Sequence, residues 1–380
     1  MNFISKVKNL KGKVVILRAD FNVPIKNGLI VDTSRIDANI ETINFLKEKG
    51  AKVFIISHLG KDGNETLKPV FEYLKKIYEI TFYEKIPENK KDITGLVLLE
   101  NVRSFDGEMT NSLEFAKNLS KLADIFVNDA FSVSHRKQSS VYAITHFLPS
   151  YFGLHFEKEM TSLSAVFKPE RPFTFIIGGA KFDTKLPIIK KFLKIADSVF
   201  VGGALANRFL ELKGLSIGES FSDRGDYGLE EIINNKKIVL PEDVVVKEKN
   251  GTSSLVSVSG VSSNGEIVDI GETTVQAMKD LLEKSKSILW NGPFGKYEEG
   301  FDKATIEILN FLKDKKDKKI IIGGGDTVAV ISKLGIKNEF YFVSMAGGAM
   351  IDYLSGGTLP GIDAVKKSNK RFFIKKLFIR

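Results

Sequence analysis

Short apolar runs recur along the chain, and each run stops at polar residues or at glycine. Four runs of strand length lie in the first half, at residues 14–17, 53–56, 96–99 and 125–127. Between them, apolar residues recur at every third or fourth position, as over residues 36–46, which is the spacing of an amphipathic helix. Strands that alternate with helices predict βαβ units around a parallel sheet. The pattern therefore predicts an α/β fold.

The second half continues the alternation but places glycines where its strands end. Apolar runs lead into glycine turns at four places, which begin at Gly178, Gly202, Gly323 and Gly347. In an open parallel sheet these turns share the carboxyl edge of the strands, where ligands bind. A strand, a glycine turn and a helix together bring backbone N–H groups towards an anion. We therefore expect a phosphate or nucleotide site in this half.

An acidic residue refines this expectation, because Asp326 directly follows the glycines of residues 323–325. A carboxylate and a phosphate repel each other unless a cation lies between them. Mg²⁺ beside nucleotide phosphates is held in this way. The second half thus indicates a nucleotide site with a metal ion.

The first half carries cations near its strand ends instead of glycines. They are Arg18, Arg35, His58, Arg103 and Arg136. Such a group suits a small polyanion. Arg35 lies at the start of a predicted helix, where the helix dipole disfavours a cation by about 0.3–1 kcal/mol. We interpret Arg35 as a residue that faces phosphoryl charge, with neutralisation by Asp32 and Asp37 as the alternative.

The composition is that of an ordinary globular protein of two or three domains, with 380 residues, of which 43% are hydrophobic and 27% charged. The chain contains no cysteine, so neither disulfides nor thiolate chemistry is available. It shows no signal peptide and no apolar segment long enough to span a membrane. We therefore expect a cytoplasmic protein.

The formal net charge of +9 is concentrated at the C-terminus. Residues 366–380 contain seven lysines and arginines and no acid, and the rest of the chain carries only +2. A charge excess confined to a terminus is not the footprint of a nucleic-acid-binding surface. We expect no nucleic-acid partner and no membrane partner. The apolar residues of this tail favour packing against the first half, with binding to an acidic membrane surface as the alternative.

Several catalytic signatures are absent from the sequence. It contains no Walker A motif, no protein-kinase signature, no Ser-His-Asp order and no histidine-rich metal cluster. A cationic acceptor site and a nucleotide site remain. Phosphoryl transfer needs little more, because positioning and charge neutralisation dominate its catalysis.

The chain resembles the phosphoglycerate kinase family over essentially its full length. In the first half the resemblance rests on the residues 17–24 (Leu-Arg-Ala-Asp-Phe-Asn-Val-Pro), 57–60, 100–103, 128–131 and 135–136. In the second half it rests on residues 178–181, 290–295, 323–327 and 359–361. Each motif is moderately specific alone, and their joint order is highly specific.

This resemblance implies two Rossmann-like lobes, each a parallel sheet flanked by helices, joined by a hinge helix. Residues 1–150 with the tail 361–380 would bind the glycerate substrate, 151–168 would form the interdomain helix, and 169–360 would bind the nucleotide. The resemblance also implies a monomer that closes by hinge bending. Its reaction would be reversible phosphoryl transfer from 1,3-bisphosphoglycerate to MgADP, giving 3-phosphoglycerate and MgATP, in glycolysis and gluconeogenesis.

Individual roles are implied in the same way. The glycerate substrate would be held by Asp20, Asn22, Arg35, His58, Arg103 and Arg136. The nucleotide would be held by Gly179, Lys181, Lys185, Gly203, Pro293, Glu298, Gly323, Gly324, Gly325, Asp326 and Thr327, with Asp326 on Mg²⁺. The catalytic groups would be Arg35, Lys181, Gly347 and Gly348. A carboxylate acceptor is already ionised at neutral pH, so its attack needs no general base.

The chain departs from the family pattern at three places. They are Lys61-Asp62 in place of Arg-Pro, the order Asp183-Thr184, and Met345-Ala346 in place of Thr-Gly. These departures bear on rate and affinity rather than on the class of reaction.

Alternative interpretations remain open from the sequence. Asp20 and Asn22 are also typical turn formers, His58 suits a satisfied histidine at a strand end, and Arg103 and Arg136 suit surface ion pairs. At the level of function, one alternative is a kinase for a different small acid. Another is a catalytically weak protein that binds nucleic acid or membrane through its basic tail.

Overall fold

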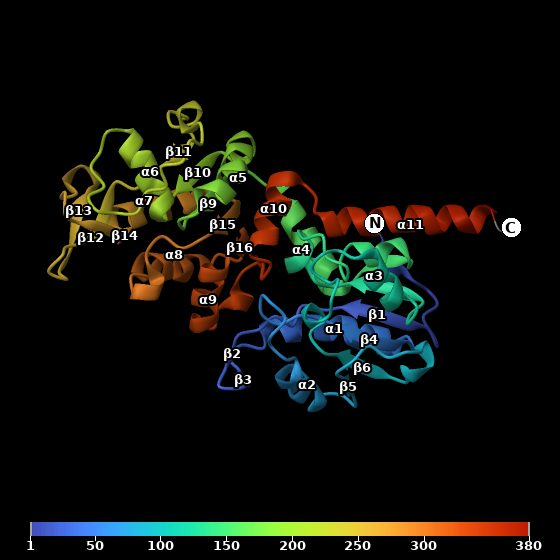
Figure 1. Cartoon of the computed structure of the whole chain (residues 1–380). Coiled ribbons are helices and arrows are strands. Elements are labelled where there is room, and N and C mark those ends of the chain that lie inside the picture. Colours follow the sequence, from blue (N-terminus) through green and yellow to red (C-terminus); the bar gives the residue numbers. More distant parts are fainter. Residues whose placement is uncertain (1, 379–380) are drawn as a thin grey trace. The chain divides into compact units, whose positions relative to one another are not determined.

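The structure, a computed structural model, describes residues 2–378 and divides into two compact units (Figure 1). Unit 1 comprises Met1–Thr161 and Gly356–Arg380, and unit 2 comprises Ser162–Ser355. The chain leaves unit 1 within helix α4 (Leu154–Ser164). Each unit is built around its own parallel sheet flanked by helices, as the sequence predicted.

The segment expected as a connecting helix, residues 151–168, contains three kinds of structure. It begins inside strand β8 (Ser150–Phe152), continues as α4, and ends in the 3-10 helix η6 (Ala165–Phe167). The other 3-10 helices are η1 (Ile4–Lys6), η2 (Lys90–Asp92), η3 (Val102–Ser104), η4 (Phe131–Val133), η5 (Ala143–His146), η7 (Leu229–Glu231), η8 (Val258–Gly260), η9 (Tyr297–Glu299) and η10 (Lys337–Glu339).

The sheet of unit 1 has six parallel strands in the order β5-β6-β4-β1-β7-β8. Besides β8, they are β1 (Val14–Arg18), β4 (Lys52–Ile56), β5 (Thr81–Tyr83), β6 (Leu96–Leu99) and β7 (Ile125–Asn128). Each of the four apolar runs predicted as strands in the first half is therefore a strand. All five residues of β1 are buried, because it lies between β4 and β7 and is covered on both faces.

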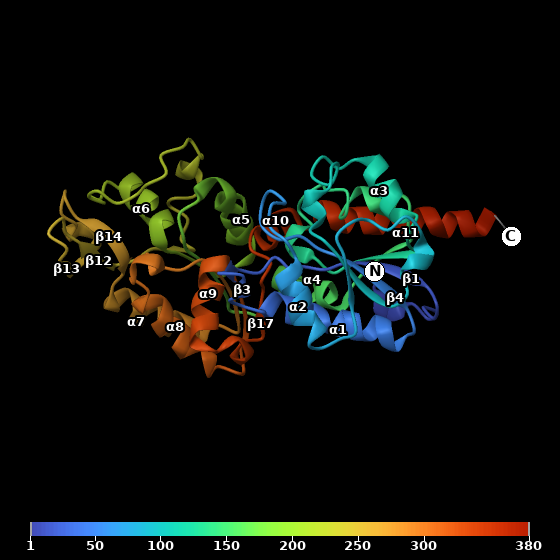
Figure 2. The same cartoon turned by 60° about the horizontal axis from the view of Figure 1, so that its bottom comes forward.

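Helices cover both faces of this sheet (Figure 2). Helices α1 (Ser34–Glu48) and α2 (Lys68–Lys75) share a core with one face, and α3 (Leu113–Ser120) shares a core with the other. A two-stranded hairpin, β2 (Ile25–Lys26) and β3 (Leu29–Ile30), precedes α1. Its turn is Asn27-Gly28, both with positive φ, a pair that is typical of two-residue hairpin turns.

The sheet of unit 2 also has six parallel strands, in the order β11-β10-β9-β15-β16-β17. They are β9 (Phe173–Ile177), β10 (Ser198–Val201), β11 (Ile238–Val239), β15 (Ser287–Asn291), β16 (Lys319–Gly323) and β17 (Phe342–Val343). The chain runs from β9 outward in one direction and then resumes at β15 on the other side. This reversal makes a switch point between β9 and β15, where open α/β sheets bind ligands.

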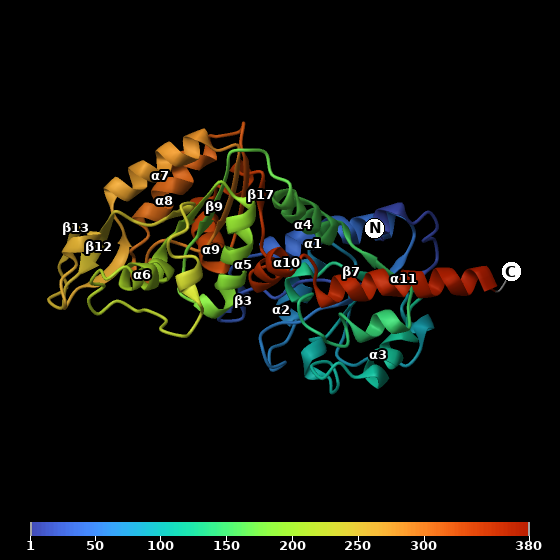
Figure 3. The ribbon, with the colours of Figure 1, turned by 90° about the horizontal axis from the view of Figure 1, so that it is seen from above.

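Helices flank this second sheet on both sides (Figure 3). They are α5 (Phe182–Ile195), α6 (Gly203–Leu212), α7 (Glu272–Lys284), α8 (Lys303–Lys313), α9 (Gly325–Leu334) and α10 (Gly348–Gly356). Buried residues of α7, α8 and α9 form one core with Ile176, Trp290 and Ile322 of the strands. On the opposite face, Phe192 of α5 packs against Phe175, with ring centroids 4.7 Å apart.

A small antiparallel sheet in unit 2 is absent from the sequence prediction. Its strands run in the order β13 (Ser253–Ser257), β12 (Asp243–Lys247) and β14 (Glu266–Ile270). It packs against α6 and α7 and contributes residues to the cavity described below.

The C-terminal helix α11 (Pro360–Phe378) packs against unit 1, next to β8 and η5. The Ser368 hydroxyl donates to the carbonyl of Leu148 at 2.8 Å, and Arg371 donates to the carbonyl of His146 at 3.0 Å. These contacts agree with the expected packing of the tail, whereas the side chains beyond Phe372 lie outside the described residues. No helix in residues 2–378 has the length and apolar character needed to cross a membrane.

A buried acid fixes the start of α4. Asp129 follows β7, and its Oδ1 accepts a hydrogen bond from the backbone N–H of Phe156 at 2.9 Å. Burial raises the pKa of Asp129 to about 7. Gly153 lies against this carboxylate, so closely that a Cβ at this position would overlap it. Position 153, just before α4, therefore requires glycine, because a larger residue would displace the Asp129 carboxylate.

We predict that Gly153→Ala destabilises the protein by about 1–3 kcal/mol, the usual cost of overpacking a buried site. Gly95→Ala is the matched control, because Gly95 has no positive φ and no heavy atom within 4 Å of its would-be Cβ. The control should be neutral or stabilising by up to about 1 kcal/mol, since alanine restricts the unfolded chain. Urea unfolding of both variants measures this difference, and equal stabilities would contradict the packing argument.

Candidate active site

The cations predicted in the first half gather at the carboxyl edge of the unit 1 sheet. His58 lies two residues after β4, and Arg103 lies in η3, which follows β6. Arg18 is the last residue of β1. We call these three residues the cation cluster. Parallel strands bring their carboxyl ends to one edge, which is why residues so far apart in sequence meet here.

Arg18 is fully buried and holds His58 in one protonation state. Its Nη2 lies 3.2 Å from His58 Nδ1. An arginine N–H only donates, so Nδ1 is the acceptor and the ring is neutral with its proton on Nε2. Burial, followed by the charge of Arg18, lowers the pKa of His58 well below its ordinary value. Among the described residues, this ring is thus left with one free donor, the Nε2 proton.

The charge of Arg18 is compensated through a serine. Arg18 Nε donates to the Ser140 hydroxyl at 2.9 Å, and that hydroxyl donates to Glu108 Oε1 at 2.6 Å. The backbone N–H of Ser140 donates to the other oxygen of Glu108 at 2.9 Å. Burial lowers the pKa of Arg18, whereas the charge of Glu108 raises it. Glu108 was not predicted from the sequence, and it is the buried counterion of the cation cluster.

Arg103 has unused donors. Its Nη1 donates to the carbonyl of Gly60, while its Nε and Nη2 are buried without a partner in the part of the chain that the structure describes. Burial, together with the charges of Arg18 and Arg136, lowers the pKa of Arg103 to about 10. The alternative that Arg103 is a surface ion-pair residue is wrong, because its exposed fraction is 6%. Its free N–H groups suit an anion.

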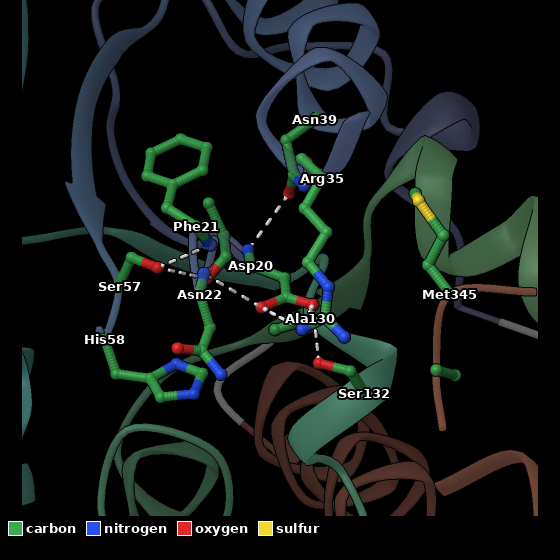
Figure 4. A network of polar contacts seen from close by, with 12 residues as sticks. Asp20, Phe21, Asn22, Arg35, Asn39, Ser57, His58, Ala130, Ser132 and Met345 are labelled. Carbon is green, nitrogen blue, oxygen red and sulfur yellow. Dashed lines mark hydrogen bonds and ion pairs between the residues drawn. The ribbon is translucent and has the colours of Figure 1, made fainter. Parts of the chain in front are cut away.

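Asp20 lies next to the cation cluster and is held by two side chains (Figure 4). Its Oδ2 lies 3.2 Å from Arg35 Nη1 and accepts the Ser132 hydroxyl at 2.6 Å. Burial alone raises the pKa of Asp20, but the charge of Arg35, together with the Ser132 hydrogen bond and the charge of Arg18, brings it below its ordinary value. Asn22 accepts the backbone N–H of Gly60 at 2.9 Å.

Arg35 and Arg136, the other two predicted arginines of this site, have different partners. Arg35 pairs with Asp20, whereas Asp37 accepts hydrogen bonds from the hydroxyls of Thr33 and Tyr73. Arg136 is exposed, and its Nε lies 3.2 Å from His135 Nε2. The charge of Arg136 lowers the pKa of Arg103, so these two arginines lie near each other. All six predicted glycerate-binding residues therefore belong to one region of unit 1.

Unit 2 contains a cavity of about 400 Å³ above its switch point. Five of the predicted nucleotide residues line it: Gly179, Gly203, Pro293, Glu298 and Asp326. The sequence did not predict its apolar walls, which include Leu210, Phe221, Val244, Ile267 and Phe294. These walls come from α6, the small antiparallel sheet and neighbouring loops. A flat apolar group with a polar end fits such a cavity.

Glycine is required where β9 and β15 end. The backbone N–H of Gly178 donates to the carbonyl of Asn291 at 2.9 Å, and a Cβ on Gly178 would overlap the carbonyl of Pro293. Lys185 of α5 reaches back over this turn, where its Nζ donates to the carbonyl of Gly178. Burial lowers the pKa of Lys185 to about 8, although the nearby charge of Asp326 opposes this effect.

The other predicted nucleotide and catalytic residues lie on the same edge of the sheet but do not line the cavity. Lys181 is exposed and immediately precedes α5. The turn at residues 323–325 connects β16 to α9, and Thr327 in its first turn has a buried hydroxyl without a partner among the described residues. Gly347 has a positive φ, and Gly348 begins α10.

Comparisons with known proteins agree with this arrangement. A model of the family described as phosphoglycerate kinase matches residues 4–357. A phosphoglycerate kinase of Wolbachia sp. subsp. Drosophila simulans (strain wRi) is 40% identical, over 94% of this chain and 97% of that protein. The phosphoglycerate kinase structure from Coxiella burnetii has a TM-score of 0.84 at 32% identity, covering 96% of this chain and 98% of that one. The structure of phosphoglycerate kinase from Pyrococcus horikoshii OT3 has a TM-score of 0.83 at 28% identity, covering 97% and 100%.

We predict that Glu108→Gln lowers the free energy of unfolding by about 3 kcal/mol, because it leaves Arg18 buried without its counterion. Glutamine keeps the size of the side chain but only one accepting oxygen, so the variant removes the charge together with one of the two hydrogen bonds from Ser140. Glu88→Gln, at an exposed position, is the control and should change stability by less than about 0.5 kcal/mol. Urea unfolding at neutral pH measures both, and a small loss for Glu108→Gln would mean that Arg18 does not depend on this carboxylate.

Proposed function

The chain belongs to the phosphoglycerate kinase family, and we propose how its residues divide the work of that enzyme. It is a phosphotransferase with a carboxyl group as acceptor. It moves a phosphoryl group reversibly from 1,3-bisphosphoglycerate to ADP, giving 3-phosphoglycerate and ATP, a step of glycolysis. The observation that carries the division of roles is the buried Arg103, whose Nε and Nη2 have no partner among the described residues.

The glycerate substrate binds to unit 1. Arg103 and Arg136 hold its anionic groups, and the Nε2 proton of His58 donates to the same substrate. Asp20 needs a different partner, because a carboxylate only accepts hydrogen bonds. The carboxylate and the dianionic phosphate of 3-phosphoglycerate also only accept, so the donor left for Asp20 is the 2-hydroxyl. Asn22 completes the site beside Gly60.

The nucleotide binds to unit 2. The apolar walls of the cavity hold the base, and Glu298 accepts hydrogen bonds from the ribose hydroxyls. The glycine turns and the start of α9 direct N–H groups at the phosphates. Lys185 and Lys181 supply positive charge, and Thr327 supplies its hydroxyl to a phosphate oxygen.

Magnesium fits the residues at this edge of unit 2. Asp326 is exposed directly after the glycine turn, and its Oδ1 lies 3.5 Å from the hydroxyl of Tyr297. The described residues contain no group of three or more histidine, cysteine, aspartate or glutamate side chains able to hold a metal alone. Mg²⁺ in proteins is usually bound by one or two carboxylates together with substrate phosphates, and Asp326 would supply the carboxylate here. The ion supplies charge neutralisation at the phosphates.

Transfer requires the two substrates to meet, since their sites belong to different units. We propose that the units close by hinge bending near α4, which excludes water from the reacting groups. Arg35 and Lys181 then neutralise the moving phosphoryl group, and the N–H groups of Gly347 and Gly348 donate to it. Each site is formed within one chain, so we propose that the protein acts as a monomer, in the cytoplasm.

A coupled assay tests the function. The purified protein with 3-phosphoglycerate and MgATP should oxidise NADH through a dehydrogenase that reduces the acyl phosphate. Arg35→Ala should retain less than about a tenth of this turnover, because an arginine that stabilises phosphoryl charge contributes on the order of 10³–10⁵ in rate. Arg171→Ala, which removes an exposed arginine paired with Asp197, is the control and should be fully active. Absence of turnover by the wild-type protein, or an active Arg35→Ala variant, would contradict the assignment.

The lowered pKa of Lys185 predicts that nucleotide binding depends on pH. Its pKa is about 8 without ligand, and bound phosphates favour its charged form. Binding must therefore take up protons above neutral pH, and the affinity for ADP must fall as pH rises through 8. Calorimetry at about pH 8.5 in two buffers of different ionisation enthalpy measures this uptake.

Lys185→Arg provides the contrast, because arginine stays charged across this range. The variant should bind ADP without the proton uptake that Lys185 causes in the wild-type protein. Equal uptake by the variant and the wild-type protein would show that another group titrates.

A further inference from the structure

Ser132 makes the shortest contact to Asp20 in the site. It lies in η4, between the buried residues Phe131 and Val133, and its own side chain is half-buried. Its hydroxyl donates to Asp20 Oδ2 at 2.6 Å, whereas the nearest approach of Arg35 to the same oxygen is 3.2 Å (Figure 4). No motif of the sequence distinguished this serine.

The two oxygens of Asp20 are used unequally. Oδ2 takes both the Ser132 hydroxyl and Arg35 Nη1. Among the described residues, Oδ1 has only two long contacts, 3.4 Å from the backbone N–H of Asn22 and 3.5 Å from Arg35 Nη1. Oδ1 is therefore the oxygen with capacity left for a further donor.

We propose that Ser132 is a positioning residue that holds the carboxylate of Asp20 so that Oδ1 accepts the 2-hydroxyl of the glycerate substrate. The inference rests on the proposed function, in which that hydroxyl is the donor for Asp20. Rotation of an aspartate carboxylate about χ2 is broad and has no strong preference of its own. A short hydrogen bond from a rigid element is what fixes which oxygen faces the substrate.

Arg35 alone does not perform this task. It is 30% exposed, and in the proposed mechanism its guanidinium turns to the moving phosphoryl group. When the guanidinium moves towards the phosphoryl group, its ion pair with Asp20 weakens. Ser132 keeps its donor on Oδ2 throughout, because η4 is anchored by two buried side chains. The serine thus lets Arg35 act on the phosphoryl group without releasing the substrate hydroxyl.

Ser132→Ala tests the proposal. Loss of a hydrogen bond to a charged group should raise KM for 3-phosphoglycerate by about tenfold. KM for ATP and the thermal midpoint should stay unchanged, and Ser132→Thr, which keeps a hydroxyl, should restore most of the affinity. Ser5→Ala is the matched control, because it removes another hydroxyl-to-carboxylate bond of unit 1, the 3.1 Å contact with Glu157. The control should leave both KM values unchanged.

A substrate analogue without the 2-hydroxyl separates positioning from a general loss of affinity. The analogue is the phosphate ester of 3-hydroxypropanoate, measured as a competitive inhibitor. Ser132→Ala should leave its inhibition constant unchanged while weakening 3-phosphoglycerate about tenfold, since only the hydroxyl contact depends on Ser132. Equal weakening of both compounds, or no weakening of either, would overturn the proposal. Failure of the proposed function is a different result, namely a wild-type protein that does not turn over 3-phosphoglycerate at all.

Discussion

Removing guanidinium groups from water is the constraint on which the structure of unit 1 depends. A buried ion costs several kcal/mol unless its charge and hydrogen bonds are compensated. Arg18 is compensated by Ser140 and, through it, by Glu108. Arg103 is compensated only in part, because Nε and Nη2 have no partner among the described residues. Unit 1 therefore contains a buried charge with hydrogen-bond donors left for an anion, which in the proposed function is the glycerate substrate.

In the proposed function, unit 2 binds its anion mainly through backbone N–H groups. The close approach of the loops after β9 and β15 leaves no room for a Cβ at Gly178 or Gly292, so the turn must be glycine. That close approach also brings Lys185 over the carbonyl of Gly178, where burial lowers its pKa to about 8. Both units thus hold one cation in a site that disfavours its charge. In the proposed function, bound phosphate removes this penalty, so ligand binding and local stability are linked in each unit.

Much of the fold followed from the sequence, because strands buried on both faces of a parallel sheet read as continuous apolar runs. The antiparallel sheet did not, since its outer strand β13 is largely exposed and rich in serine and so carries no such run. The glycine turns and strand-end cations were predictable because the carboxyl edge gathers them. Ser132 and Glu108 were not, since their partners lie 112 and 32 residues away and nothing local marks either side chain.

Burial and neighbouring charges together fix the protonation state of the proposed site at neutral pH. Asp20 is ionised, because its pKa lies below the ordinary value. His58 is neutral, because burial and Arg18 lower its pKa. Lys185 and Arg103, with pKa values of about 8 and about 10, are mostly or fully charged. No group in the site has to exchange a proton during the reaction, which matches a transfer between a carboxylate and a phosphate that needs no general base. The environment that makes these cations costly to bury is therefore also what keeps proton transfer out of the reaction.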